Sequence, residues 1–241
     1  MPRSPVCLLD MVGSEAPDND VRIAEQPFET LDPDRPLHRD FASLDNYDER
    51  LNHLLEVATQ VIAREGYHNA SMRKVAKEAG VSLAGLYHYF DSKEEMLFLI
   101  QFRSFSSLLS NLKEKLQGVD NPVNQLRIMI NEYVIFFSKK LMALKVCSHE
   151  LDSLSGSKYE TCRKIRHEYY LLARSIIDQI ITTQSSNSHL DRRIATMSLF
   201  GTMNWLYRWY NPKRDCAPKT LAKQISDQFL LGLLIQPNQS P

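Results

Sequence analysis

The segment Met72–Phe90 restricts the possible folds of this chain more than any other, because successive positions in it have defined mechanical roles. Val75 and Ala76 lie on one apolar stripe at helical spacing, and the small side chain of Ala76 permits a close helix approach. Gly80 supplies a tight turn after the first helix, and Leu86 faces inward from a second one. Two short helices joined in this way form the helix-turn-helix, a motif that binds DNA, although two ordinary core helices can share the same pattern.

Serine residues mark the start of each helix in this region. Ser71 precedes the predicted helix Met72–Glu78, and Ser82 precedes a second short helix. Ser92 then opens a long helix, with Glu95 three residues later. A serine at the N-cap accepts a hydrogen bond from the first turn, and a glutamate three residues on completes a capping box. These positions therefore fix the boundaries of three helices.

Helical periodicity extends through the rest of the chain. A first amphipathic helix begins at Tyr47 and ends before Gly66, and no segment beyond Gly118 shows the β-branched alternation of strands. We therefore predict an all-α fold of nine helices, with one domain at residues 45–95 and a larger one at 96–241. Breaks rich in Pro, Gly or Ser divide the last part into blocks at about 121–141, 144–153, 157–184, 189–210 and 217–234.

The beginning of the chain differs from the rest in composition and charge. Residues 1–44 hold six of the eleven prolines and nine acidic residues against four arginines, which predicts a disordered N-terminal tail. Residues 1–95 sum to −8 and residues 96–241 to +8, although the whole chain is neutral. An acidic N-terminal part does not match the basic surface expected of a DNA-binding segment, and the sequence leaves this mismatch open.

Composition argues against several other classes of protein. No apolar run reaches the roughly 18–20 residues that cross a bilayer, and the N-terminus lacks the pattern of a secretory signal. We therefore expect a cytoplasmic protein without membrane contact. The four cysteines are scattered without a C-x-x-C pair, so neither a disulfide framework, a metal site nor a cofactor is expected. No catalytic motif is present, which makes an enzyme with an appended DNA-binding domain the weaker interpretation.

The helix-turn-helix and its flanks resemble the N-terminal signature of the TetR family of transcriptional regulators. The resemblance covers residues 47–97 and rests on Gly66-Tyr67, Ala70-Ser71, Val75-Ala76, Ala79–Ser82, Leu86–Phe90 and Ser92–Glu95. It implies a nine-helix TetR-like architecture, in which a three-helix DNA-binding domain precedes a helical ligand-binding and dimerisation domain. It also implies a repressor that binds a palindromic, double-stranded operator as a homodimer.

The same resemblance implies which side chains meet DNA. The helix after Ser82 is the implied recognition helix, and the starts of the neighbouring helices suit phosphate because helix N-termini attract anions. His88 could instead be a surface residue without a role, and Tyr89 and Phe90 are expected in the core. The implied DNA contacts are Ser71, Ser82, Leu83, Ala84, Gly85, Tyr87, His88 and Lys93.

The last two helical blocks are predicted to form the subunit interface. Small residues in the first block permit a close helix approach, and apolar residues recur at four-residue intervals in the second. An intramolecular core would give the same pattern and stays an alternative. The residues concerned are Ala195, Ser198, Gly201 and Thr202 in the first block, and Leu221, Ile225 and Phe229 in the second.

Residues 200–212 resemble, more loosely, the acyl-CoA-responsive TetR regulators of fatty-acid and steroid catabolism, which carry a similar N-W-x-x-x-W/F-Y/F-x-P run. This implies release from the operator by a small-molecule inducer, an acyl-CoA or a related amphipathic anion. A polyphosphate head could meet the basic residues of one predicted helix, Arg163, Lys164, Arg166 and Arg174. The predicted ligand contacts are Met129, Tyr133, Phe136, Phe137, Arg166, Tyr169, Tyr170, Trp205 and Trp209.

Other interpretations of the larger domain stay open. A repressor of the multidrug type would hold a lipophilic cation with acidic side chains beside aromatic ones, for which Glu132, Glu150 and Glu168 are the candidates. Alternatively, the aromatic residues form an ordinary core, the basic helix is a solvated face, and the protein is a ligand-independent dimeric DNA-binding protein.

Overall fold

The computed structural model describes residues 41–184 and 190–234, and within these ranges it contains helices but no strand. The predicted all-α fold is therefore confirmed. The predicted tail, residues 1–44, lies outside the described residues except for its last four, which belong to the first helix. The helices are α1 Phe41–Glu65, α2 Met72–Glu78, α3 Leu83–Tyr87, α4 Lys93–Leu116, α5 Pro122–Ser138, α6 Leu141–His149, the 3-10 helix η2 Leu151–Ser153, α7 Gly156–Gln184, α8 Arg192–Asn204, α9 Leu206–Trp209 and α10 Pro218–Leu234.

Each of the nine predicted helical segments is present in the described ranges. The break predicted at 142–143 lies earlier, because α5 ends at Ser138 and α6 begins at Leu141, and three larger differences concern other segments. α1 begins at Phe41, six residues earlier than predicted, and residues 41–46 include no glycine or proline that would stop a helix. The segment predicted at 144–153 consists of α6 and the separate turn η2. The segment predicted at 189–210 is divided at Trp205 into α8 and the short α9.

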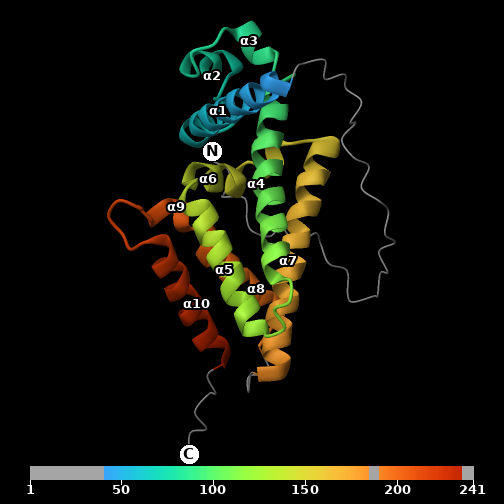
Figure 1. Cartoon of the computed structure of the whole chain (residues 1–241), viewed down its shortest axis with the longest axis vertical. Coiled ribbons are helices and arrows are strands. Elements are labelled where there is room, and N and C mark those ends of the chain that lie inside the picture. Colours follow the sequence, from blue (N-terminus) through green and yellow to red (C-terminus); the bar gives the residue numbers. More distant parts are fainter. Residues whose placement is uncertain (1–40, 185–189, 235–241) are drawn as a thin grey trace, which may run out of the picture.

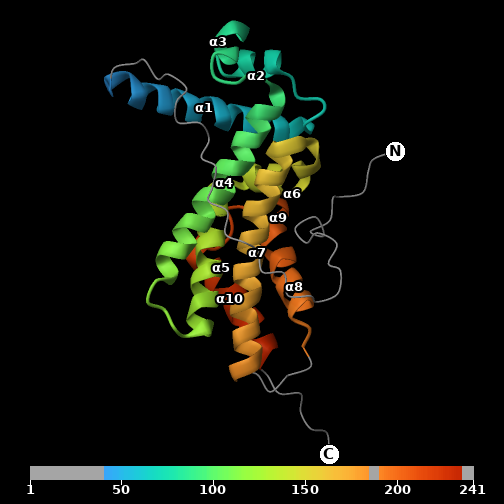
Figure 2. The same cartoon turned by 90° about the vertical axis from the view of Figure 1, so that its right-hand side faces the viewer.

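The helices form a small head on an elongated body. Figure 1 shows α1, α2 and α3 at one end, while α4 runs from this head along the body beside α7. Figure 2, turned by 90°, shows α4 leaving the head and the other helices gathered below it. None of the helices in residues 41–184 and 190–234 has the length and apolar character of a membrane span.

Two hydrophobic clusters hold these parts together. The head cluster includes the fully buried Leu54, Leu86 and Phe90, and it continues into the body through Val146 of α6 and Cys162 of α7. Full burial of a large apolar side chain stabilises the fold by roughly 1.5–3 kcal/mol. Because the head cluster includes residues of α6 and α7, the head is packed on the body rather than tethered to it.

The body cluster is aromatic at its centre. Tyr133 of α5, Tyr169 of α7 and Phe200 of α8 are buried in it, and α10 packs along α5. Leu221 and Ile225 of α10 belong to this cluster. These two residues therefore pack within the subunit. Their position agrees with the alternative of an intramolecular core rather than with the subunit interface predicted from their spacing.

Two glycines enable the turns of the head. Gly66 ends α1 with φ +80°, and Gly80 lies between α2 and α3 with φ +66°. Both conformations are left-handed, where a Cβ atom costs roughly 1–2 kcal/mol. The two predicted stops are confirmed at these positions.

Candidate nucleic-acid interface and regulatory core

The three predicted serine caps set the geometry of the helix-turn-helix. Ser71 Oγ accepts a hydrogen bond from the Lys74 N–H at 3.3 Å, and Ser82 Oγ accepts one from the Gly85 N–H at 2.9 Å. Ser92 Oγ accepts one from the Glu95 N–H at 3.0 Å. The Glu95 carboxylate reaches back to the Asp91 N–H at 2.5 Å, one residue before the expected partner. Each hydroxyl keeps its own O–H as a donor.

The predicted DNA-contact residues of α3 share one outer surface. Tyr87 is 49% exposed, and His88, Ser82 and Ala84 are exposed beside it, whereas Leu83 and Gly85 are half-buried. His88 and Tyr89 make an edge-to-face ring contact. Phe90 is buried as expected, and the half-buried Tyr89 packs against the head cluster. The outer surface of α3 therefore exposes the phenol of Tyr87 and the imidazole of His88 beside the small side chains of Ser82 and Ala84.

Ion pairs join α1 and α2 in the head. Arg64 pairs with Glu78 at 2.7 Å, and Lys74 pairs with Glu65. Glu65 and Glu78 therefore neutralise basic residues inside the head. Two exposed cations of α2, Arg73 and Lys77, form no ion pair with a carboxylate in the described part of the chain. The sequence prediction did not include Arg73 or Lys77, although a basic pair on the first helix of the motif is a visible signal.

Lys93 is directed inward at the loop between α1 and α2. Its Nζ donates to the carbonyl oxygens of Tyr67 at 2.9 Å, His68 at 3.4 Å and Ala70 at 3.0 Å. It also lies 4.3 Å from the centre of the Tyr67 ring. A lysine ammonium has three protons to donate, and these three carbonyls account for them. Lys93, predicted to contact phosphate, thus fixes the loop that leads into Ser71.

A hydrogen-bond path joins this loop to the body. The Tyr67 N–H donates to Glu150 Oε1 at 3.0 Å, and Gln101 Nε2 donates to the Glu150 carbonyl at 3.0 Å. Arg166 Nη1 donates to Gln101 Oε1 at 3.1 Å and to the Cys147 carbonyl at 2.9 Å. Arg166 is only 6% exposed, so a buried cation of the body connects through two side chains to the backbone of the head.

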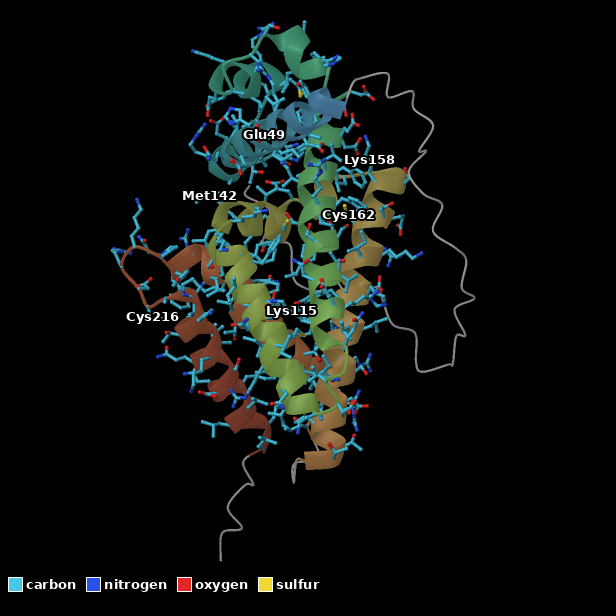
Figure 3. All side chains as sticks on the ribbon, in the orientation of Figure 1. Glu49, Lys115, Met142, Lys158, Cys162 and Cys216 are labelled. Carbon is cyan, nitrogen blue, oxygen red and sulfur yellow. The ribbon has the colours of Figure 1, made fainter. Side chains whose placement is uncertain are left out.

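The start of α7 makes a second link between head and body. Glu94 Oε1 accepts hydrogen bonds from the backbone N–H and from the hydroxyl of Ser155, both at 2.7 Å. Lys158 lies 3.8 Å from the same carboxylate, and Figure 3 labels Lys158 at this end of α7. Hydrogen bonds from Ser155 lower the pKa of Glu94 below its usual range. The carboxylate therefore stays charged at neutral pH and holds α4 against α7.

Most of the predicted ligand contacts lie together in the body core. Tyr133 and Phe137 have ring centres 4.8 Å apart, and Tyr133 and Tyr169 are 6.2 Å apart. Burial raises the pKa of Tyr169, whose hydroxyl has no hydrogen-bond partner among the described residues. Met129, Tyr133, Phe137, Arg166, Tyr169 and Tyr170 are buried, and Phe136 is half-buried beside them.

Two predicted ligand contacts do not join this core. Trp205 is 54% exposed and Trp209 is 47% exposed. Trp205 lies at the α8–α9 break and Trp209 at the end of α9, and both indoles are exposed. The sequence pattern runs as one helix through this region, whereas the structure divides it at Trp205.

One face of α8 is open to solvent. Ser198 and Thr202 are exposed, and a Cβ atom on Gly201 would meet nothing within 4 Å. Large apolar side chains are exposed on the same helix and on α10, at Ile194 and Leu231. Of the small residues predicted for the interface, Ser198 and Thr202 are thus exposed in the single subunit, Gly201 is half-buried, and Ala195 packs against the body cluster.

The acidic residues considered for a lipophilic cation are committed elsewhere. Glu132 pairs with Lys115 at 2.7 Å, and Glu168 pairs with Lys113. Glu150 accepts from the Tyr67 N–H and from the Ser153 hydroxyl at 2.9 Å. These carboxylates are therefore already neutralised or hydrogen-bonded.

The cysteines carry no sign of metal or redox chemistry in the described part of the chain. Cys147, Cys162 and Cys216 are free thiols, and Figure 3 labels Cys162 between α4 and α7. Burial raises the pKa of the Cys147 thiol to about 11 and that of Cys162 to about 12. Both remain protonated at neutral pH, which makes them poor nucleophiles and poor metal ligands.

Comparison with known proteins gives matches in both parts of the chain. Residues 54–100 match the model of bacterial regulatory proteins of the tetR family, and residues 119–233 match the tetracyclin repressor-like C-terminal domain. The two matches together cover about two thirds of the chain.

Individual relatives are regulators of the same kind. The HTH-type transcriptional repressor KstR2 of Rhodococcus jostii is 25% identical over 186 residues, which cover 76% of this chain and 91% of that protein. The HTH-type transcriptional activator FasR of Mycolicibacterium smegmatis is 26% identical over 185 residues, with 77% and 83% coverage. A crystal structure of AibR in complex with isovaleryl coenzyme A and operator DNA shares the fold, with a TM-score of 0.63, 23% identity and coverage of 77% and 98%. The chain therefore belongs to the TetR family of DNA-binding transcriptional regulators, a family of regulators rather than enzymes.

Proposed function

We propose that this protein is a homodimeric repressor that leaves a palindromic operator when an acyl-CoA, or a related amphipathic anion of lipid catabolism, binds to it. Residues 45–95 are the proposed DNA-binding domain, and residues 96–241 the ligand-binding and dimerisation domain. Regulators of this family bind operator DNA and dimerise, which supports the general scheme.

The surface of α3 carries the DNA-binding part of the proposal. Tyr87 and His88 are exposed on it, and Leu83, Ala84 and Gly85 leave room for the edges of bases. The free O–H groups of Ser71 and Ser82 can donate to phosphate while their oxygens cap α2 and α3. Arg73 and Lys77 supply further phosphate contacts. Lys93 acts on DNA indirectly, by holding the α1–α2 loop.

Dimerisation is supported by the open face of α8. A helix with Ser198, Gly201 and Thr202 on its surface allows a second helix to approach closely. Ile194 and Trp205 extend this face with apolar area, and burying them against a partner would remove their surface from water. We therefore assign Trp205 to the subunit interface rather than to the ligand.

An acyl-CoA fits the charge and chemistry of the body better than a lipophilic cation does. Glu132, Glu150 and Glu168 have partners already, so a cationic ligand would have to compete for them. Arg166 is a buried positive charge 4.8 Å from the Phe105 ring centre, at the edge of the aromatic core, where it also donates to Gln101 and to the Cys147 carbonyl. A thioester ligand could insert its acyl group among Met129, Tyr133 and Phe137. The names of relatives concern fatty-acid metabolism, and AibR was crystallised with isovaleryl coenzyme A.

Release would use the path from Arg166 to Tyr67. A ligand that binds more tightly to one orientation of the head shifts the dimer towards that orientation, which misaligns the two α3 helices on DNA. Arg166, Gln101 and Glu150 provide successive contacts between the core and the head. The path is therefore a physical connection along which occupancy of the core can affect α3.

The proposal is tested with operator DNA selected by the protein from a random library. The complex is titrated in a mobility-shift assay with acyl-CoA thioesters, the matching free acids and lipophilic cations. We expect thioesters to dissociate it. Dissociation by cations, with thioesters inert, would overturn the ligand class, and in vitro transcription from a promoter that contains the operator separates repression from activation.

A further inference from the structure

A hollow of about 870 Å³ lies where the head meets the body. Its walls come from α1, α4, the end of α5 and the first turn of α6, and Figure 3 shows the labelled wall residue Met142 on α6 just beneath α1. Ligand pockets usually measure roughly 300–1,000 Å³. This hollow is therefore large enough for a nucleotide, and it adjoins both the head and the regulatory body.

The hollow carries more positive charge than its neighbourhood can neutralise. Arg103, Lys139 and Lys140 line it, and Glu56 is its one acidic wall residue. None of these three cations forms an ion pair with a carboxylate in residues 41–184 and 190–234: Arg103 donates to Asn52 Oδ1 at 2.9 Å, and Lys140 lies 5.0 Å from the Phe136 ring centre. The exposed cations Lys113, Lys115 and Arg127 on the body, by contrast, each have a carboxylate partner.

The floor of the hollow touches the aromatic core. Ser104 and Ser138 line the floor, and both are buried. A residue adjacent to each serine, Phe105 after Ser104 and Phe137 before Ser138, belongs to the body core, and the two rings lie 6.2 Å apart. An amphipathic molecule could therefore keep its charged end in the hollow while its apolar end enters the core beside Tyr133.

We propose that this hollow binds the phosphate-bearing nucleotide end of the effector, an inference that rests on the proposed function and adds a second site region to it. The basic helix α7 is the less suitable position for that end. Arg163 pairs with Glu160 at 2.9 Å, and Arg166 is buried with two acceptors. Phosphate oxygens form charge-assisted hydrogen bonds with lysine and arginine, and three such side chains face the hollow.

Occupancy of the hollow gives a direct cause of release. Arg103 of α4 holds Asn52 of α1 through one hydrogen bond, so a phosphate that draws the guanidinium away breaks a link between body and head. A bound nucleotide would also occupy space between α1 and the first turn of α6. Lys145, further along α6, still holds the Ala63 carbonyl at 2.5 Å, so α1 would pivot about its C-terminal end rather than detach.

The experiment measures binding of adenosine 3′,5′-bisphosphate, the charged end of coenzyme A, to the full chain by calorimetry. The variant Lys139→Gln/Lys140→Gln removes two charges from exposed positions of the α5–α6 turn. The control variant Lys213→Gln/Arg214→Gln removes the same charge from the exposed turn before α10. We expect about tenfold weaker binding in the first variant and unchanged binding in the control.

Equal affinity in all three proteins, or no binding to the unmodified chain, would overturn the assignment of this site. Operator release by dodecanoyl-CoA is measured separately on the unmodified protein. Failure of the thioester to release DNA contradicts the proposed function, whereas loss of bisphosphate binding in the Lys139/Lys140 variant supports the hollow as a nucleotide site in either case.

Discussion

Among the described residues, the Glu150 side chain joins the head backbone to the path from Arg166, so replacing Glu150 is expected to change regulation without changing the DNA surface. In Glu150→Ala the Tyr67 N–H loses the acceptor that lies at 3.0 Å, and the Ser153 hydroxyl loses its acceptor at 2.9 Å. A polar group left without a partner costs about 1–3 kcal/mol when buried. Both donors are partly buried, so we expect about 1–1.5 kcal/mol of lost interaction between head and body.

That loss sets the expected size of the regulatory effect. A coupling free energy of 1–3 kcal/mol is typical between an effector site and a DNA site, and 1.4 kcal/mol corresponds to a factor of about ten. Glu150→Ala should therefore lower, by about tenfold, the factor by which dodecanoyl-CoA weakens operator binding. Affinity for the operator without ligand should change by no more than about threefold, because the α3 surface is untouched.

Fluorescence anisotropy with labelled operator, in the absence and presence of dodecanoyl-CoA, measures both quantities. Glu150→Gln keeps an oxygen acceptor for the Tyr67 N–H and should retain most of the coupling. Glu168→Gln removes a carboxylate that pairs with Lys113 on the body surface and serves as the control. A wild-type coupling factor in Glu150→Ala, with ligand binding intact, would refute the path through Glu150.

Three further predictions test other parts of the structure. Tyr87→Ala should weaken operator binding about tenfold without changing the helical content measured by circular dichroism. Arg73→Gln should lower by about one the slope with which the logarithm of operator affinity falls with the logarithm of salt concentration. Unchanged binding in both variants would refute the proposed DNA surface. Lys93→Met should destabilise the free protein by about 1–2 kcal/mol in thermal unfolding, which a residue that only contacts phosphate would not do. Gly201→Arg/Thr202→Glu should give monomers in sedimentation with the helical content preserved, because nothing in the subunit lies within 4 Å of a Cβ at Gly201; a dimeric variant would locate the interface elsewhere.

Local rules predicted most of the fold because the relevant interactions lie within a few residues of each other in the chain. A serine cap acts on an N–H three residues later, and a glycine stop acts on the turn that contains it, so Ser82 and Gly80 are readable from the sequence. The outward position of Trp205 was not readable, because it depends on a break between α8 and α9 within a continuous helical pattern.

The connections between head and body depend on contacts that the sequence does not reveal. Glu150 and Tyr67 are 83 residues apart, and Lys93 meets the carbonyls of a loop more than twenty residues earlier. A glutamate or lysine considered alone indicates only charge. Packing of α6 against α1 converts Glu150 from a candidate for holding a cationic ligand into an acceptor for the head backbone.

Most of the acidic excess of the N-terminal part comes from residues 1–44, which sum to −5, whereas residues 45–95 sum to −3. Glu65 and Glu78 pair with Lys74 and Arg64, and these pairs fix α2 against α1. Glu94 holds the start of α7, so its charge lies at the junction with the body rather than on the α3 surface. A net count over residues 1–95 therefore does not describe the charge that lies near α3. The field that a phosphate meets depends on the few charges left unpaired near α3, which makes Arg73 and Lys77 more informative than the sum.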